Sequence, residues 1–281
     1  MKKIGLLSPK GTHSEEAALW LKKFLREDFR LELCADIFDV LSAVREQTFD
    51  AGLVPVENSL EGSINVTLDT LARSDTLTVA RELVWPVKNF LLTKPTADVH
   101  AVSKIFSHAQ PLAQCRNFLR QNFPEAEIVS TASSARAAEI VAEAEENFAA
   151  IGTERAAKLN ALAATKIPAD ANNFTRFFEI RHRDRDAAPI ETFDGDKVLL
   201  ICQIDGSRAG SLCDVLTEFA RRNVNLTRIE SRPARTILGA YIFFFELDTD
   251  VGDDKLRDAI RAVYDKSIWL KNLGTFPVIN A

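Results

Sequence analysis

Apolar and polar positions alternate between two periods along the first part of the chain. Short apolar runs at residues 3–7, 31–35 and 51–56 have the length and composition of β-strands. Between them, apolar residues within 15–24 and 40–44 repeat at helical spacing. The run at residues 51–56 is almost continuously apolar, as is typical of a strand inside a parallel sheet. The pattern therefore predicts an α/β fold.

The same alternation continues into a second group of elements. Long strands at residues 77–87 and 89–93 lead away from the first group. The elements that follow are strands at 104–106, 127–131 and 149–152, helices at 133–146 and 153–160, and returning strands at 163–167 and 175–180. Two lobes joined by two crossings predict a cleft between them. We place one lobe at residues 1–80 with 161–182 and the other at 81–160.

The last third of the chain has a pattern of its own. Residues 183–196 are charged, contain Pro and Gly and lack periodicity, which predicts a linker. Residues 197–281 predict strand, helix, strand, strand, helix and strand, and the first of these helices, at 211–223, has a strong amphipathic stripe. This βαββαβ order is typical of a ferredoxin-like domain. The open edges of such sheets pair with other copies, so we expect a homo-oligomer, a dimer or a tetramer.

The composition narrows the classes of partner. A chain of 281 residues is long enough for about two domains, and its net charge of −5 argues against nucleic acid. No apolar run reaches the length of a signal sequence or a membrane span, so we expect no membrane partner and a cytoplasmic location. Four cysteines without C-x-x-C spacing predict reduced, buried thiols; they are Cys34, Cys115, Cys202 and Cys213. No metal cluster, P-loop or dinucleotide fingerprint is visible, so we expect no metal and no cofactor.

The candidate chemistry is densest in Asn173-Phe174-Thr175-Arg176-Phe177, where a hydroxyl stands beside a guanidinium between aromatic residues. The β-branched and aromatic residues predict a strand from residue 175. Neighbouring side chains on a strand point to opposite faces, so Thr175 and Arg176 share a pocket only where the strand begins at the edge of a cleft. The alternative is an ordinary strand on which Arg176 covers a surface or braces the lobe.

Other polar residues follow the ends of predicted strands, where ligands bind in open α/β sheets. They are Glu57, Asn58 and Ser59 after the run at 51–56, and Ser107, His108 and Gln114 after the strand at 104–106. Thr12 precedes a helix with capping-box spacing to Glu15, and such an N-terminus attracts anions. The alternatives are a capped loop at Glu57-Asn58-Ser59 and a structural role for His108.

Taken together, these motifs resemble prephenate dehydratase, an enzyme family of phenylalanine biosynthesis, along essentially the whole chain. The residues that carry the resemblance are Gly11-Thr12, Val54-Pro55-Val56-Glu57-Asn58-Ser59, Ser107-His108-x-Gln110-Pro111, Gln114-Cys115, Thr131-x-Ser133 and Asn173-Phe174-Thr175-Arg176-Phe177. The C-terminal part resembles the amino-acid-sensing ACT domain, through Gly210-x-Leu212 and Asn225-Leu226-Thr227-x-Ile229-Glu230-Ser231-Arg232-Pro233. Positions that depart from the family pattern are Ser8, His13, Ala109 and Ser211, and they concern loop geometry.

The resemblance implies an α/β fold with a two-lobed, periplasmic-binding-protein-like catalytic domain at 1–182, a linker at 183–196 and a ferredoxin-like βαββαβ ACT domain at 197–281. Because the first strand begins at residue 3, no room is left for the helical chorismate mutase domain that some relatives carry. We therefore expect the monofunctional form.

The resemblance also implies an activity, the decarboxylating dehydration of prephenate to phenylpyruvate without a cofactor. Loss of the ring hydroxyl as water needs a proton donor or a strong hydrogen bond at that oxygen. By resemblance Thr175 serves the leaving hydroxyl, Glu57 and His108 are possible proton sources, and Asn58, Ser59, Ser107 and Gln114 orient the substrate. Substrate-binding residues by the same resemblance are Thr12, Asn173, Arg176 and Phe177.

The ACT resemblance implies that L-phenylalanine binds at a subunit interface and inhibits the enzyme. The residues expected to bind it are Gly210, Ser211, Leu212, Asn225, Leu226, Glu230, Ser231, Arg232 and Pro233. Two alternatives remain open from the sequence. One is arogenate dehydratase, which runs the same chemistry on the amino counterpart of prephenate, and the other is a non-catalytic sensor of aromatic metabolites.

Overall fold

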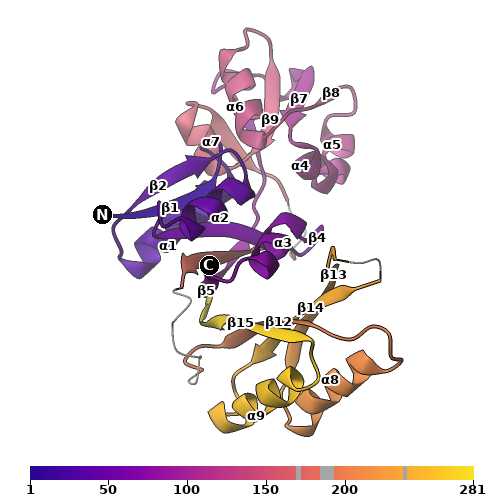
Figure 1. Cartoon of the computed structure of the whole chain (residues 1–281). Helices are drawn as coiled ribbons and strands as arrows, with labels where there is room; N and C mark the ends of the chain where they lie inside the picture. Colours follow the sequence, from indigo (N-terminus) through magenta and orange to yellow (C-terminus); the bar gives the residue numbers. More distant parts are fainter. Residues whose placement is uncertain (169–171, 184–192, 237–238) are drawn as a thin grey trace.

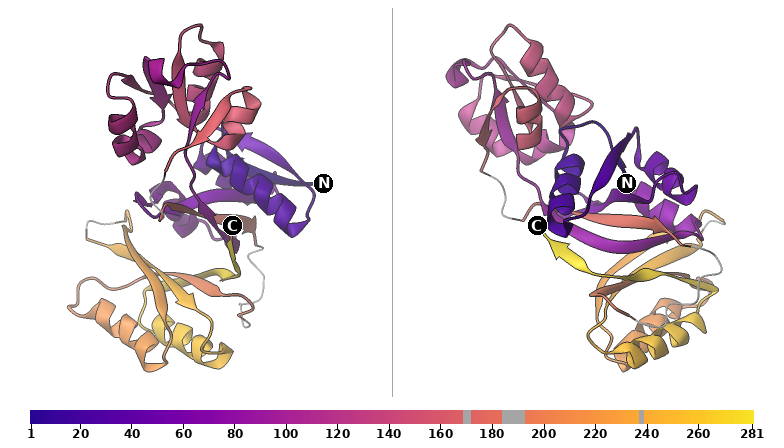
Figure 2. Two further views of the ribbon diagram at one scale, coloured as in Figure 1. Left: turned by 180° about the vertical axis from the view of Figure 1, so that it is seen from behind. Right: turned by 90° about the vertical axis from the view of Figure 1, so that its left-hand side faces the viewer.

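The computed structural model describes residues 1–168, 172–183, 193–236 and 239–281. Over these residues the chain forms three units stacked in a row, each built around its own sheet (Figures 1 and 2). The unit that contains the N-terminus lies in the middle of the row. The two-lobed catalytic domain and the separate C-terminal domain predicted from the sequence are thereby confirmed.

The middle unit is the first lobe, and its strands follow the order β16-β5-β11-β3-β1-β2, with β4 paired to β3. β1 runs parallel to β2 and β3, whereas β11 is antiparallel to β3 and β5. The strands are β1 (Lys2–Leu7), β2 (Phe29–Cys34), β3 (Ala51–Asn58), β4 (Gly62–Ser63), β5 (Leu77–Pro86), β11 (Phe174–His182) and β16 (Val278–Asn280), and the helices are α1 (His13–Leu25), α2 (Ile37–Arg45) and α3 (Asn65–Arg73).

The second lobe holds a five-stranded sheet in the order β10-β6-β9-β7-β8. Its strands are β6 (Phe90–Thr93), β7 (Lys104–Ser107), β8 (Glu127–Ser130), β9 (Phe148–Gly152) and β10 (Ala163–Lys166), and its helices are η1 (Val99–Ala101), α4 (Ala109–Gln114), α5 (Arg116–Asn122), α6 (Ser134–Glu143) and α7 (Glu154–Leu159). β5 therefore belongs wholly to the first lobe and β10 to the second. The chain crosses between lobes around residues 87–89 and after residue 167, somewhat later than the sequence pattern placed the boundaries.

The C-terminal domain has the predicted βαββαβ order, with strands paired as β13-β14-β12-β15. Its elements are β12 (Lys197–Gln203), α8 (Ser211–Arg221), β13 (Leu226–Pro233), β14 (Tyr241–Asp248), α9 (Asp253–Tyr264) and β15 (Trp269–Phe276). Both helices cover the face of the sheet that points away from the first lobe (Figure 1). Of the predicted linker, residues 184–192 lie outside the described residues.

The other face of the C-terminal sheet packs on the first lobe. One apolar cluster joins Val79 and Phe178 of the first lobe to Leu199, Phe244 and Phe276 of the C-terminal domain, all nearly or fully buried. The strand expected at 269–278 ends at residue 276, and the following β16 instead joins the sheet of the first lobe, parallel to β5. The two domains therefore share a core and a sheet edge, and they behave as one packed body.

The cysteine prediction is confirmed in part. All four thiols are free, and Cys115 and Cys202 are buried, which raises the pKa of each to about 11. Cys34 is only partly buried and Cys213 is exposed, because it lies on the solvent side of α8. Among the described helices, none is both long and apolar enough to span a membrane.

Gly274 is the closest approach between β15 and the first lobe. Its φ of +125° lies in a region that side chains disfavour, and a Cβ placed there would stand 2.7 Å from the Val79 carbonyl oxygen. The neighbouring Thr78 hydroxyl donates to the Leu273 carbonyl, so β5 lies directly against β15 at this point. Only a glycine lets the two domains approach this closely.

We predict that Gly274→Ala destabilises the protein more than Gly252→Ala, its matched control. Gly252 also has a positive φ, of +88°, but a Cβ there would meet nothing within 4 Å. The control should cost about 1–3 kcal/mol for the backbone conformation alone, and Gly274→Ala about 1–3 kcal/mol more for the clash. Urea unfolding of both variants measures the difference, and equal losses would contradict the proposed close approach.

Candidate active site

A cavity of about 350 Å³ opens between the two lobes. It lies beyond the carboxyl ends of β1 and β3 of the first lobe and of β7 of the second, where ligands of open α/β sheets bind. The lining residues are Leu7, Ser8, Thr12, His13, Ser14, Ile37, Pro55, Asn58, Ile64, Val87, Asn89, His108, Gln110, Pro111, Gln114, Ala132, Ser133, Ser134, Thr175 and Phe177. The sequence motifs from distant parts of the chain are therefore brought together here.

Strand β11 presents Thr175 and Phe177 to the cavity. Thr175 is paired with Asn58 of β3 in the register, and residues directly opposite each other across an antiparallel pair share one face of the sheet. Asn58 Nδ2 lies 3.1 Å from the Thr175 hydroxyl and donates to it. Arg176 lies between Thr175 and Phe177 in the sequence, and alternation along the strand turns its side chain to the opposite face.

A chain of side-chain amides fixes the direction of the hydrogen bonds beneath Thr175. The backbone N–H groups of Leu60 and Glu61 donate to Asn58 Oδ1, which leaves Asn58 Nδ2 as the donor to its neighbours. Asn58 Nδ2 lies 3.1 Å from three acceptors that share its two protons, Asn173 Oδ1, the Phe174 carbonyl and the Thr175 hydroxyl. Asn173 Nδ2 in turn donates to Gln114 Oε1 at 3.0 Å. Two backbone groups therefore set the orientation of three amides, and the Gln114 amide nitrogen remains available to the cavity.

The same chain determines what the Thr175 hydroxyl can do. Because its oxygen accepts a hydrogen bond from Asn58, its own proton is free to point at a group in the cavity. Asn58 is buried and Thr175 is partly buried, so the pair is shielded from bulk water on the protein side. The arrangement offers an oriented hydroxyl donor at the cavity wall.

Two helix N-termini supply further donors. Thr12 caps α1, and its hydroxyl accepts from the Glu15 backbone N–H, while the Glu15 carboxylate accepts from the Gly11 N–H rather than from that of Thr12. Ser133 caps α6 on the other lobe by accepting from the Arg136 N–H. Thr12 and Ser133 both line the cavity, so the positive ends of two helix dipoles approach it from opposite sides.

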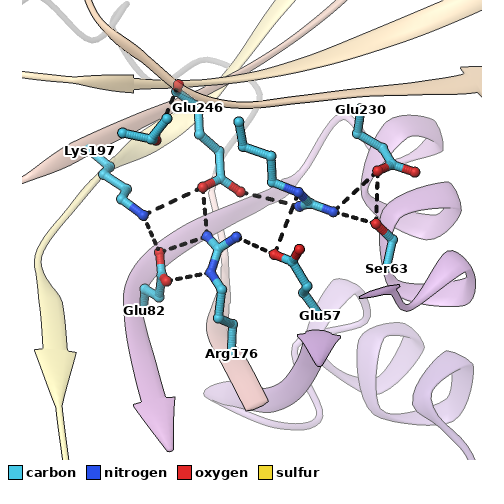
Figure 3. Close-up of polar contacts among 9 residues, drawn as sticks. Glu57, Ser63, Glu82, Arg176, Lys197, Glu230 and Glu246 are labelled. Atoms are coloured by element: carbon cyan, nitrogen blue, oxygen red, sulfur yellow. Dashed lines mark hydrogen bonds and ion pairs between the residues drawn. The ribbon is translucent and has the colours of Figure 1, made fainter. Parts of the chain in front are cut away.

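Glu57 and Arg176 do not belong to this cavity, and their predicted catalytic and binding roles are corrected. Both side chains lie on the opposite face of the sheet, where Arg176 contacts Glu57, Glu82 and Glu246, each at 2.6 Å (Figure 3). Burial by itself favours the neutral form of Arg176, but hydrogen bonds and charges of Glu82 and Glu246 outweigh it and raise the pKa of the guanidinium. Because Thr175 faces the cavity, alternation along the strand turns Arg176 away from it. The alternative interpretation, an arginine that braces the lobe, therefore applies.

Two further residues of the predicted site hold the surrounding backbone instead. Ser107 is fully buried, and its hydroxyl donates to the Ile151 carbonyl at 2.7 Å, away from the cavity. Ser59 donates to the Asn172 carbonyl and accepts from the Phe174 N–H, so it fastens the turn before β11. Asn173 lies between Asn58 and Gln114 as a link in the amide chain rather than on the cavity wall.

The sequence reasoning missed Asn89. Asn89 lines the cavity beside Gln114, and its Nδ2 donates to Gln114 Oε1 at 3.3 Å. Only 3% of the residue is exposed. Its Oδ1 has no hydrogen-bond partner among the described residues. A single amide at the crossing between lobes belongs to no periodic pattern, and only the position of that crossing signals its role.

The predicted regulatory residues divide into three groups. Gly210, Ser211 and Leu212 line a separate cavity of about 310 Å³ in the C-terminal domain, together with Tyr241 and Phe243. Ser231 and Pro233 pair with Phe243 and Tyr241 respectively and therefore lie on the same face of the sheet. The third group does not reach that cavity: Asn225 binds Asp248, Leu226 packs on the core of the domain, and Glu230 and Arg232 point to the first lobe.

Comparison with known proteins agrees with this geometry. The family model for prephenate dehydratase matches residues 4–185, and the model for the ACT domain matches residues 199–263. The chain is 33% identical to prephenate dehydratase of Lactococcus lactis, covering 98% of both chains, and 32% identical to that of Methanocaldococcus jannaschii, covering 97% of both. The crystal structure of prephenate dehydratase from Arthrobacter aurescens, in complex with L-Phe, has a TM-score of 0.86 at 30% identity, covering 98% of this chain and 90% of that one. The chain therefore belongs to the prephenate dehydratase family and carries an ACT domain after its two catalytic lobes.

Proposed function

We propose that the cavity between the lobes converts prephenate to phenylpyruvate, with Thr175 as the hydrogen-bond donor to the departing hydroxyl. The observation that carries this proposal is the bond from Asn58 to the Thr175 oxygen, which leaves the threonine proton to the substrate. Prephenate loses its ring carboxylate as carbon dioxide and its ring hydroxyl as water, and the ring becomes aromatic. The substrate itself supplies the thermodynamic drive, so the enzyme has to stabilise the leaving oxygen.

A threonine hydroxyl is a poor acid, so Thr175 acts as a hydrogen-bond donor or as a relay. The leaving hydroxyl needs one proton to depart as water. Of the two proton sources considered from the sequence, Glu57 is held by Arg176 on the far face of the sheet, whereas His108 lines the cavity. This supports His108 over Glu57 as the proton source, and His13 is a second imidazole that lines the same cavity.

The charge of the cavity wall fits a decarboxylation. Among the described residues that line it, none is Lys, Arg, Asp or Glu. A dianion is therefore held without a lysine or arginine, by donors such as Gln114 and Ser133 and by the helix ends at Thr12 and Ser133. A lysine or arginine fixed at the ring carboxylate would stabilise the charge that has to flow into the ring, and a wall without either residue avoids this ground-state stabilisation.

The same wall favours prephenate over arogenate. Arogenate carries an ammonium group where prephenate has a keto group, and a buried ammonium needs an acidic partner. The described lining residues offer no carboxylate for it. Measured rates on the two substrates decide this preference, and faster turnover of arogenate would contradict it.

We further propose that L-phenylalanine regulates the enzyme from the ACT domain, in a homo-oligomer. The cavity at Gly210, Ser211 and Leu212 opens beside the exposed edge strand β13, on which Ile229 is 46% exposed. An edge strand with an exposed apolar side chain is suited to pairing with a second copy. Phenylalanine would bind between the Gly210 turn of one subunit and the β13 edge of another.

We predict that Thr175→Ala lowers the rate of phenylpyruvate formation by about 10²-fold or more, because the donor to the leaving hydroxyl is lost. Thr175→Ser keeps a hydroxyl at the same position and serves as the matched control, which should retain most of the rate. Phenylpyruvate absorbance follows turnover, and circular dichroism checks the fold. Near-normal turnover by a folded Thr175→Ala protein would remove Thr175 from the mechanism.

We predict that Asn58→Asp lowers kcat by about 10²-fold, the usual effect of removing one preorganised donor. Aspartate still accepts from the Leu60 and Glu61 N–H groups but cannot donate to Thr175. Asn160→Asp is the control, because Asn160 makes a comparable bond to the Ala156 carbonyl outside the cavity. Steady-state kinetics on both variants test this, and similar small losses would argue against the amide chain as part of the site.

We predict that the double substitution Ser231→Ala, Pro233→Ala weakens phenylalanine inhibition by about tenfold, which corresponds to about 1.4 kcal/mol of lost binding. Thr227→Ala is the control, because Thr227 lies on the same strand but does not line the cavity of the C-terminal domain, and it should leave inhibition unchanged. Inhibition curves for prephenate turnover provide the measurement. An unchanged curve for the double variant would exclude this edge of the sheet from the binding site.

A further inference from the structure

Arg176 lies at the junction of the catalytic lobe and the ACT domain, in a cluster of charged side chains (Figure 3). Its guanidinium donates to Glu57 of β3 and to Glu82 of β5, which belong to the same sheet as Arg176. Its third partner, Glu246 of β14, belongs to the ACT domain and lies 2.6 Å away. One side chain is therefore held by both domains at once.

Two cations of the ACT domain complete the cluster. Lys197 lies between Glu82 and Glu246, at 3.4 Å and 3.6 Å. Arg228 contacts Glu246 at 3.2 Å and Glu57 at 3.6 Å. The ACT domain thus contributes two cations and Glu246, and the catalytic lobe contributes Arg176 and two carboxylates. The contact of Arg176 with Glu246 crosses the boundary in one direction, and those of Lys197 with Glu82 and of Arg228 with Glu57 cross it in the other.

The cluster is shielded from water, so its geometry is strongly constrained. The side chains of Glu82 and Glu246 are only 1% and 2% exposed, and that of Arg176 is 16% exposed. Burial raises the pKa of Glu246, but the charge and hydrogen bond of Arg176, with Lys197 and Arg228, outweigh it and hold that pKa below its usual range. Displacing one buried charge from its partners is costly, so movement of Glu246 has to be followed by Arg176.

The cluster is also the reverse side of the catalytic pair. Arg176 is paired with Glu57 in the register, and the next pair along the same two strands is Thr175 with Asn58. Thr175 and Asn58 face the cavity, whereas Arg176 and Glu57 face the ACT domain. The register is irregular between Arg176 and Phe177, so the backbone at this point departs from a regular ladder.

We propose that Glu246 of the ACT domain is a positioning residue for the reaction, which acts through Arg176 on the strand segment that carries Thr175. Phenylalanine bound to the ACT domain then changes turnover through this cluster, because Glu246 is fixed to the ACT sheet and Arg176 to the catalytic strand. This inference rests on the proposed dehydratase activity and on its inhibition by phenylalanine. It assigns a regulatory connection to residues that do not line either cavity.

Glu246→Gln in the full-length protein tests this connection. The amide keeps the size of the side chain but removes the charge that holds Arg176. We expect the ratio of rates without and with saturating phenylalanine to fall by at least about fivefold, the lower end of typical allosteric coupling. Phenylalanine itself should still bind, as measured by calorimetry, and any change in basal rate should be in kcat rather than KM, since the cavity wall is untouched.

Glu218→Gln is the matched control. Glu218 of α8 is another carboxylate of the ACT domain with little exposed surface, paired with Arg222 at 2.6 Å and Lys266 at 3.2 Å. Helix α8 covers the face of the ACT sheet that points away from the first lobe (Figure 1). Glu218→Gln removes a paired carboxylate from the ACT domain without touching the cluster, so the rate ratio should stay that of the wild type. An equal loss of inhibition in both variants would attribute the effect to general destabilisation and overturn the proposal.

Arg228→Lys provides a second variant if Glu246→Gln fails to fold. It keeps a positive charge but removes the fork that joins Glu246 to Glu57, so the rate ratio should fall in the same direction. Wild-type inhibition in a folded Glu246→Gln or Arg228→Lys protein that still binds phenylalanine would overturn the inference. A wild-type protein that forms no phenylpyruvate from prephenate would instead refute the proposed function, so the two failures are distinguishable.

Discussion

The organisation of this protein depends on one antiparallel pairing, that of β11 with β3. Two adjacent residue pairs of this ladder, Thr175 with Asn58 and Arg176 with Glu57, point to opposite faces of a single sheet. One face closes a cavity between two lobes, and the other contacts a second domain. Because the period of a strand is two residues, a shift of the register by one residue would exchange the two faces and abolish both arrangements.

The charged face is not explained by stability alone. Taking ions out of water has a large desolvation cost, and buried ion clusters are often no more stabilising than apolar side chains of similar size. The apolar cluster that joins Phe178 to Phe244 and Phe276 already holds the two domains together. The ion cluster adds a fixed relative orientation of the two domains, because Arg176 binds three carboxylates at defined positions. Apolar contacts alone would let one surface shift along the other.

Much of the fold could be predicted because its elements have strong local periodicity. The stripe of α8 and the apolar run of β3 each specify their own element without reference to the rest of the chain. The three residues of β16 could not be placed in this way, since their partner β5 lies almost 200 positions earlier in the sequence. A strand this short has no periodicity of its own, and its pairing follows from how the two domains pack.

The candidate site was predictable in its residue types but not in its faces. The rule that strand neighbours diverge already separated Thr175 from Arg176, yet nothing local says which of them faces the cavity. The same ambiguity applies to Glu57 and Asn58, and one decision settles both pairs because their registers are linked. Asn89 could not be predicted at all, because a single amide at the crossing between lobes is part of no periodic pattern. It contacts Gln114 only in the folded protein.

The division of charge between the two faces connects architecture to chemistry. The described wall of the cavity has no Lys, Arg, Asp or Glu. Seven such side chains from the two domains meet on the reverse side of the same strands: Glu57, Glu82, Arg176, Lys197, Arg228, Glu230 and Glu246. A wall of oriented amides and helix ends, without lysine or arginine, is suited to a dianion whose charge must move when carbon dioxide leaves. Strong charges are kept one residue away, where they hold the backbone rather than the substrate. One face of the strand pair thus holds the backbone through ion pairs, and the other face lines the cavity. The ACT domain contacts the charged face, and so it reaches the strands that carry Thr175 and Asn58 without entering the cavity.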